Sequence, residues 1–255
     1  MYIDLVFIVL LVSHILGDFY LQSDKMAKER KRKYIAVIKH GAVYAFTIAI
    51  ILLLCIPKST NRLYLCIAVS ICHFAIDTIK HIIEKLPGEK ITLVKKYIFI
   101  VDQAVHFLTL ATCWYFFGRS IDTRWFVAQE MAHLPKLPIT IFLGVLLIGK
   151  TIGIWIANSN LRNYWPENAK IDLSSNSTKN AGKTIGYLER LIVLIFLMYQ
   201  QFGAIAFVLT AKSVARFKDI EKDQRLAEYY LIGTLMSVVS AIVIALLLGL
   251  VPITK

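Results

Sequence analysis

Histidine and aspartate residues recur four positions apart within apolar stretches of this sequence. There are three such pairs: His14 with Asp18, His73 with Asp77, and Asp102 with His106. Residues four apart lie on one helix face, so each pair can present an imidazole and a carboxylate to a single point. Ionisable side chains are costly inside apolar helices, and each of these is therefore a candidate functional residue.

The chemistry that these side chains suggest is metal binding. Imidazole and carboxylate together suit zinc, manganese or iron, and such a metal can activate water or polarise a phosphoryl or carbonyl oxygen. We predict that the six residues bind one or two divalent metal ions and that Asp18 and Asp77 also take part in catalysis. His40 is predicted to be a further ligand or a general base. Two alternatives stay open, a hydrogen-bonded network that ties helices together and a proton relay.

Cationic residues near these positions suggest an anionic substrate. Lys39 and Lys80 lie next to the His/Asp positions and are predicted to attract a lipid headgroup or a phosphoester. A second polar group in the last third of the chain contains three cations: Arg190, Lys212 and Arg216. We predict that these bind a phosphate or carboxylate. The alternative is ion pairing within the membrane, in which Glu189 pairs with Lys212 or Arg216.

The elements that must position these residues are apolar helices. Of the 255 residues, 57% are hydrophobic and 18% are charged, whereas about a quarter are charged in a typical soluble domain. A membrane span needs roughly 20 mostly apolar residues. We predict an all-α, polytopic membrane bundle of eight segments, with seven as the alternative: Leu5–Gln22, Tyr34–Ile56, Leu63–Leu86, Tyr97–Phe117, Ile139–Asn158, Thr184–Gln201, Phe202–Phe217 and Ala227–Val251.

The sixth and seventh segments are interrupted by polar residues. Gln200, Gln201 and Gly203 lie between them. Such an interruption is typical of a tight hairpin, a re-entrant pair or one long broken helix, and it requires cover from protein or a wet cavity.

Charge patterning predicts the orientation of the chain. The net charge is +12, but the basic residues lie mostly in short loops beside apolar segments, which argues against nucleic-acid binding. With eight segments, every strongly basic loop falls on one side, which we predict to be cytoplasmic, with both termini outside. The His/Asp positions then share one depth in the cytoplasmic half of the bilayer. We also predict a four-helix His/Asp unit over 1–117 and a C-terminal unit over 118–255, with a polar cytoplasmic loop at 163–182.

Several motifs around the His/Asp positions resemble a family of bacterial inner-membrane proteins of unknown function. The matching motifs are His14-Ile15-Leu16-Gly17-Asp18-Phe19, Leu21-Gln22, Lys39-His40, His73-Phe74-Ala75-Ile76-Asp77 with Lys80, and Asp102-Gln103 with His106. The resemblance implies a multi-pass protein of the bacterial inner membrane and supplies no reaction. The His/Asp pattern is also broadly similar to proposed membrane-bound metal-dependent hydrolases, which is an analogy only.

These observations predict a membrane-embedded, divalent-metal-dependent hydrolase that acts on a lipid or a phosphorylated small molecule. The first alternative is a proton- or cation-coupled transporter, since broken helices like the segment at 200–203 are typical of transporters. The second is a structural or regulatory membrane protein without catalysis. The predicted partners are membrane lipids and the anionic substrate, and the sequence leaves the metal and the oligomeric state open.

Overall fold

The computed structural model describes residues 4–86, 89–123, 136–158, 181–215, 217, 221 and 224–252, and every regular element in these ranges is helical. The predicted all-α class is therefore confirmed for the described part of the chain. The chain divides into two compact units, Met1–Leu143 and Gly144–Lys255. The division falls inside helix α6, which runs from Lys136 to Leu146.

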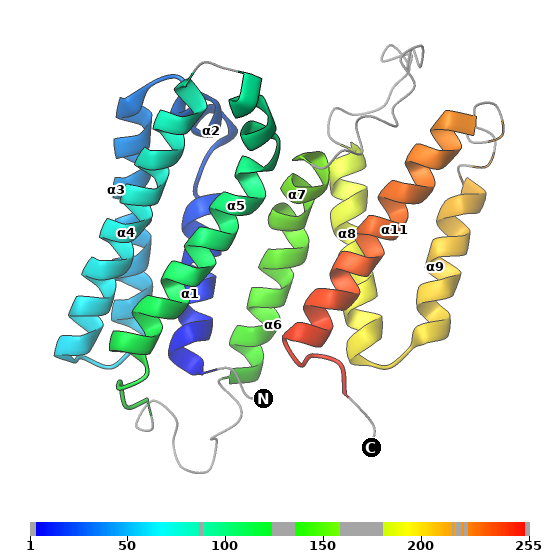
Figure 1. Cartoon of the computed structure of the whole chain (residues 1–255). Helices are drawn as coiled ribbons and strands as arrows, with labels where there is room; N and C mark the ends of the chain where they lie inside the picture. The colour runs from blue at the N-terminus through cyan, green and yellow to red at the C-terminus, as the bar shows by residue number, and fades with distance from the viewer. Residues whose placement is uncertain are drawn as a thin grey trace. The chain divides into compact units, whose positions relative to one another are not determined.

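The first unit is a bundle of helices joined by short turns (Figure 1). Its helices are α1 (Leu5–Ile15), α2 (Asp24–Arg30), α3 (Tyr34–Cys55), α4 (Thr60–Lys85) and α5 (Glu89–Cys113). α3 packs against α1 and α4, and α4 packs against α5. Asp4, Ser23 and Ser59 cap α1, α2 and α4 by accepting hydrogen bonds from first-turn N–H groups, which stabilises these helix ends.

The apolar core of this unit fills the half of the bundle that contains the beginning of α1. Leu5 and Leu10 of α1 pack there with Leu52 from the end of α3 and Leu65 from the beginning of α4. Tyr44 of α3 belongs to this core and is 1% exposed. It lies one helical turn from His40 and so marks the boundary between the apolar core and the polar positions. The other half of the bundle is thus left for the His/Asp positions.

Large apolar side chains cover the outside of the same helices. Phe46, Leu54 and Phe116 are each more than 60% exposed, as expected where lipid rather than water is the neighbour. In the described ranges, five helices are long and apolar enough to cross a membrane, or six if α1 and α2 count as one broken span. These helices indicate a membrane protein, and the predicted count of seven or eight segments stays a prediction.

The second unit contains α7 (Ile152–Asn158), α8 (Ala181–Met198), α9 (Phe202–Ala215) and α11 (Gln224–Leu247). α8 packs against both α9 and α11. Of the three arrangements predicted for the polar interruption, the structure has the tight hairpin, with α8 and α9 antiparallel (Figure 1). Gln200 takes the left-handed conformation that reverses the chain, with φ 57°, and its amide donates to the carbonyl of Pro252 at 2.8 Å.

The close contact between α3 and α4 depends on a glycine. A Cβ atom on Gly41 would lie 2.7 Å from Cδ2 of Phe74. We expect Gly41→Ala to lower the free energy of unfolding by about 1–3 kcal/mol, because the ring of Phe74 must move within a packed interface. Thermal unfolding in detergent measures this. Gly203→Ala is the matched control, since nothing lies within 4 Å of its added Cβ; an equal loss in both variants would contradict the packing argument.

Candidate functional site

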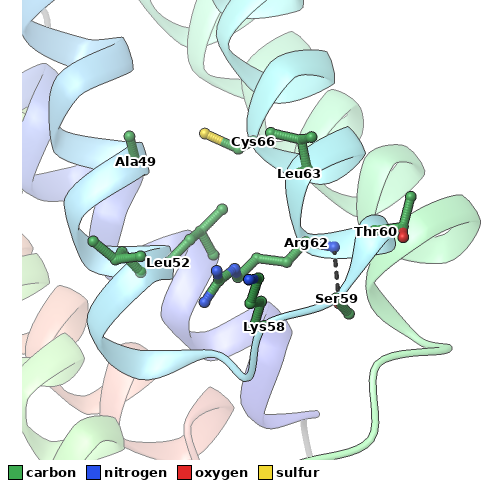
Figure 2. A pocket seen from close by; sticks show the side chains of 9 residues that line it. Ala49, Leu52, Lys58, Ser59, Thr60, Arg62, Leu63 and Cys66 are labelled. Atoms are coloured by element: carbon green, nitrogen blue, oxygen red, sulfur yellow. Dashed lines mark hydrogen bonds between the residues drawn. The ribbon is translucent and has the colours of Figure 1, made fainter.

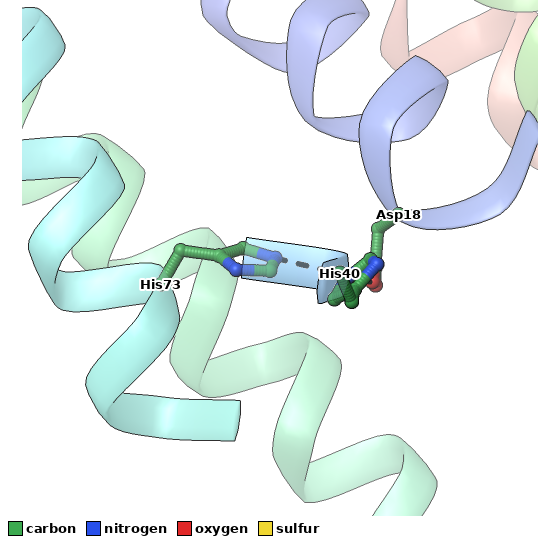
Figure 3. A group of neighbouring side chains, drawn as sticks. All are labelled: Asp18, His40 and His73. Carbon is green, nitrogen blue, oxygen red and sulfur yellow. Dashed lines mark hydrogen bonds and ion pairs between the residues drawn. The ribbon is translucent and has the colours of Figure 1, made fainter. Parts of the chain in front are cut away.

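The predicted His/Asp side chains come together in the polar half of the first unit. Each is at most 6% exposed. Four elements contribute them: α1 with the turn that follows it carries His14 and Asp18, α3 carries His40, α4 carries His73 and Asp77, and α5 carries Asp102 and His106. Figure 3 shows three of them, Asp18, His40 and His73, pointing toward one another from three separate elements.

Asp18 lies in a π-helical turn, Leu16–Tyr20, at the end of α1. The N–H of Leu21 donates to the carbonyl of Leu16 at 2.8 Å, which closes the wide turn. Single π-helical turns are rare and often mark functional sites. Gly17 is required here, because a Cβ atom would lie 2.8 Å from the ring of Tyr44. The turn and the aromatic ring therefore fit closely beside the cluster.

Asp18 and His40 form a hydrogen-bonded pair. Nε2 of His40 lies 3.1 Å from Oδ1 of Asp18, and the amide of Gln103 donates to Oδ2 at 3.1 Å. Both carboxylate oxygens of Asp18 are thus engaged. The other ring nitrogen of His40, Nδ1, lies 3.3 Å from the side-chain amide of Gln22. Asp18 thus orients the imidazole as a carboxylate orients a general base, and Gln22 occupies the nitrogen that would take the proton.

His73, Asp77 and His106 form a different kind of group. Their ligand atoms lie within 4.8 Å of one another, as do those of the overlapping group Asp18, His40 and His73. Both ring nitrogens of His73, Nε2 of His106 and Oδ1 of Asp77 are buried without a hydrogen-bond partner among the described residues. A buried polar atom without a partner costs about 1–3 kcal/mol, so a ligand that engaged several of these atoms at one point would lower that cost.

The orientation of His106 fits that of a metal ligand. Its Nδ1 lies 2.8 Å from the carbonyl oxygen of Asp102, so Nδ1 carries the proton and donates it. Nε2 then has its lone pair directed away from that bond. Metal-binding histidines commonly donate their other ring N–H to a carbonyl or carboxylate.

Tyr44 closes the group from the side of the apolar core. Its ring stacks on His73, with ring centroids 3.4 Å apart, and its hydroxyl lies 3.1 Å from Nδ1 of His14. The side chain of His14 also stacks on His106, at 5.2 Å between centroids. His14 therefore lies beside the group, held by Tyr44 and His106.

Arg30 is a site residue that none of the His/Asp motifs in the sequence contains. The chain bends by 85° between the α1 segment and α2, and Arg30 at the end of α2 returns to the cluster. Its Nη1 donates to Oδ2 of Asp77 at 2.9 Å and lies 3.6 Å from Oδ1 of Asp18. His81 anchors this helix end by donating from Nδ1 to the carbonyl of Arg30 at 2.7 Å.

Arg30 is one of six cations that follow the first apolar segment. The positive-inside rule accounts for such a basic run without requiring that any of its residues belongs to a functional site. One signal could have identified it. Three aspartates in apolar helices require compensating cations, and the basic run is the nearest source in the sequence.

The other predicted cations have different surroundings. Lys39 is exposed, and Lys80 donates to Oδ2 of Asp102 at 2.7 Å. In the second unit, Lys212 pairs with Glu189 at 2.5 Å, which is the ion pair named above as the alternative. Arg216 lies outside the described residues.

Arg190 of α8 is buried beside a break in the helical backbone at Gly149. Its guanidinium donates to the carbonyls of Ile148 and Gly149 and, at 3.2 Å, to the hydroxyl of Ser237. The backbone is non-helical at Gly149, inside the π-helical turn Leu147–Thr151. Arg190 therefore satisfies carbonyls that the helix break leaves open.

A family comparison covers the part of the chain that contains the cluster. The model of the family described as "Protein of unknown function (DUF3307)" matches residues 6–135. The chain belongs to the DUF3307 family. No curated protein and no solved structure matches it. Every member of the His/Asp cluster, Arg30 included, lies within the DUF3307 region.

Proposed function

We propose that this protein is a divalent-metal-dependent hydrolase of the bacterial inner membrane, with a site that opens to the cytoplasmic leaflet and acts on a lipid or phosphorylated substrate. The observation that carries the proposal is the convergence of His73, Asp77 and His106. In this group both ring nitrogens of His73, Nε2 of His106 and Oδ1 of Asp77 are buried without a hydrogen-bond partner among the described residues. The location rests on the family resemblance and on the basic loops.

The donor set suits a catalytic metal. Two imidazoles and one carboxylate are a common set for catalytic zinc, which takes three protein ligands and keeps a further position for water. The same set with open positions also suits iron. A structural zinc site would instead be closed by four ligands.

The charges of the cluster also favour a bound cation. Three carboxylates, those of Asp18, Asp77 and Asp102, pair with two cationic side chains, Arg30 and Lys80. One buried negative charge is left without a cationic side chain among these groups. An uncompensated buried charge is strongly unfavourable, and a divalent ion or a proton on an imidazole would offset it.

We assign the other steps of hydrolysis to His40, Asp18 and Lys39. A metal at the three ligands would supply an activated water. His40, oriented by Asp18, would have to exchange its contact with Gln22 for that water in order to accept a proton from it. The water oxygen would bond to the phosphorus or carbonyl carbon as the ester bond breaks, and His40 would return the proton to the leaving oxygen. Lys39, exposed one residue before His40, attracts the anionic substrate.

Metal removal and reloading of the purified full-length protein tests the proposal. We expect about one zinc, manganese or iron ion per chain, and hydrolysis of phosphatidic acid or phosphatidylglycerol in vesicles that stops with a chelator and returns with the metal. Phosphate and fatty-acid release are the measurements. A protein that binds none of these metals, or one whose hydrolysis survives chelation, would refute the proposal.

A further inference from the structure

A second concave site lies in the first unit at the turn that joins α3 to α4 (Figure 2). This groove has a volume of about 680 Å³. It lies at the end of α3, whereas His40 lies near the beginning. The nine positions from His40 to Ala49, the first α3 residue that lines the groove, span about 14 Å of helix. The groove is therefore separate from the His/Asp cluster and independent of the function proposed for it.

The lining combines apolar walls with two cations. Leu52, Leu53 and Leu63 provide apolar surface, and Lys58 and Arg62 lie beside them in the turn and the first turn of α4. Nη1 of Arg62 donates to the carbonyl of Ile56 at 2.8 Å, which fixes the guanidinium at the turn. The ammonium of Lys58 makes no hydrogen bond or ion pair with any described residue.

The position of the groove in the fold fixes its depth in a membrane. α3 and α4 are both long and apolar enough to span, and only residues 56–59 separate them. The turn must therefore lie at a membrane surface, with Lys58 and Arg62 at the level of lipid headgroups. Leu53 and Leu63, 64% and 57% exposed, lie on the two helices next to the turn, where acyl chains begin.

We propose that this groove binds an anionic phospholipid. The lipid phosphate lies between Lys58 and Arg62, and its acyl chains follow Leu53 and Leu63 into the bilayer. Charge complementarity selects the anionic lipid, because a zwitterionic choline headgroup would add a positive charge to a site that already has two. A soluble phosphate would satisfy the cations but leave the apolar walls uncovered, so the acyl chains contribute to binding.

Native mass spectrometry of the full-length protein in detergent, with phosphatidylglycerol and phosphatidylcholine of identical chains, tests the inference. We expect selective retention of phosphatidylglycerol. Lys58→Gln should weaken its binding about fivefold, and adding Arg62→Gln should weaken it further, because each cation near a membrane surface is worth about 1 kcal/mol. Lys58 is exposed and makes no hydrogen bond or ion pair with a described residue, so thermal unfolding of the single variant, expected to be unchanged, separates binding from stability.

Lys31→Gln is the matched control, since it removes the same charge from an exposed position in the turn after α2. It should leave phosphatidylglycerol binding unchanged. Equal retention of both lipids, or an equal loss in Lys31→Gln and Lys58→Gln, would overturn the proposal. Displacement of the lipid by glycerol phosphate at comparable concentration would overturn it as well, since the groove would then bind the headgroup alone.

Discussion

Replacing His73 with alanine is expected to remove the bound metal and with it the hydrolytic activity. His73 belongs to both candidate ligand groups, and neither of its ring nitrogens has another hydrogen-bond partner among the described residues. Loss of a residue that merely supports a metal ligand typically weakens metal binding 10–100-fold. We therefore expect loss of a ligand itself to weaken binding by more than about 100-fold.

The measurement is metal content per chain, together with metal-dependent hydrolysis in vesicles. His81→Asn is the matched control, because His81 lies on the same helix and its Nδ1 donates to the carbonyl of Arg30 rather than to the ligand group. The asparagine amide can replace that hydrogen bond. A variant lacking His73 that keeps full metal content and activity would exclude both groups as the metal site.

The second large effect is expected from Arg30→Gln, which should tighten metal binding. In the structure Arg30 donates to Asp77, a proposed ligand, at 2.9 Å. A metal bound at Asp77 would share this carboxylate with the guanidinium on Oδ2 and lie beside its positive charge. A hydrogen bond between charged groups is worth about 1.5–3 kcal/mol, so its removal should raise the metal affinity roughly tenfold or more.

The same substitution should lower the Tm of the metal-free protein. Without Arg30, Asp77 is a buried carboxylate that has lost its cation, and breaking a buried pair in this way costs about 3–5 kcal/mol. Added metal should restore the Tm, and by more than it raises the Tm of the wild type. Arg32→Gln, at an exposed position two residues away, should change neither quantity.

These outcomes separate a metal site from a purely structural network. In a structural network, Arg30→Gln would lower the Tm and no divalent metal would restore it. In a metal site, the loss of Tm and the gain in metal affinity come from the same carboxylate. Metal titration monitored by calorimetry and thermal unfolding would give both values from one preparation.

Helix positions were predicted well where one short stretch of sequence determines them. The second segment was predicted as Tyr34–Ile56, and α3 runs from Tyr34 to Cys55. The fourth was predicted to begin at Tyr97, whereas α5 begins at Glu89. The sequence places the boundary too late because Lys90, Lys95 and Lys96 indicate a loop. A helix can include lysines where it extends beyond the apolar region.

The spacing of four between histidine and aspartate, and the apolar helices that carry these residues, follow from the sequence alone. Helical periodicity is a local property, so it fixes which side chains share a face without any knowledge of their neighbours. The tertiary structure decided what could not be local. It returned Arg30 to Asp77 across 47 positions, paired His40 with Asp18, and left the ring nitrogens of His73 without a hydrogen-bond partner among the described residues. Hydrogen bonds and charge pairs between helices depend on how separate segments pack, and no periodicity within one segment encodes that choice.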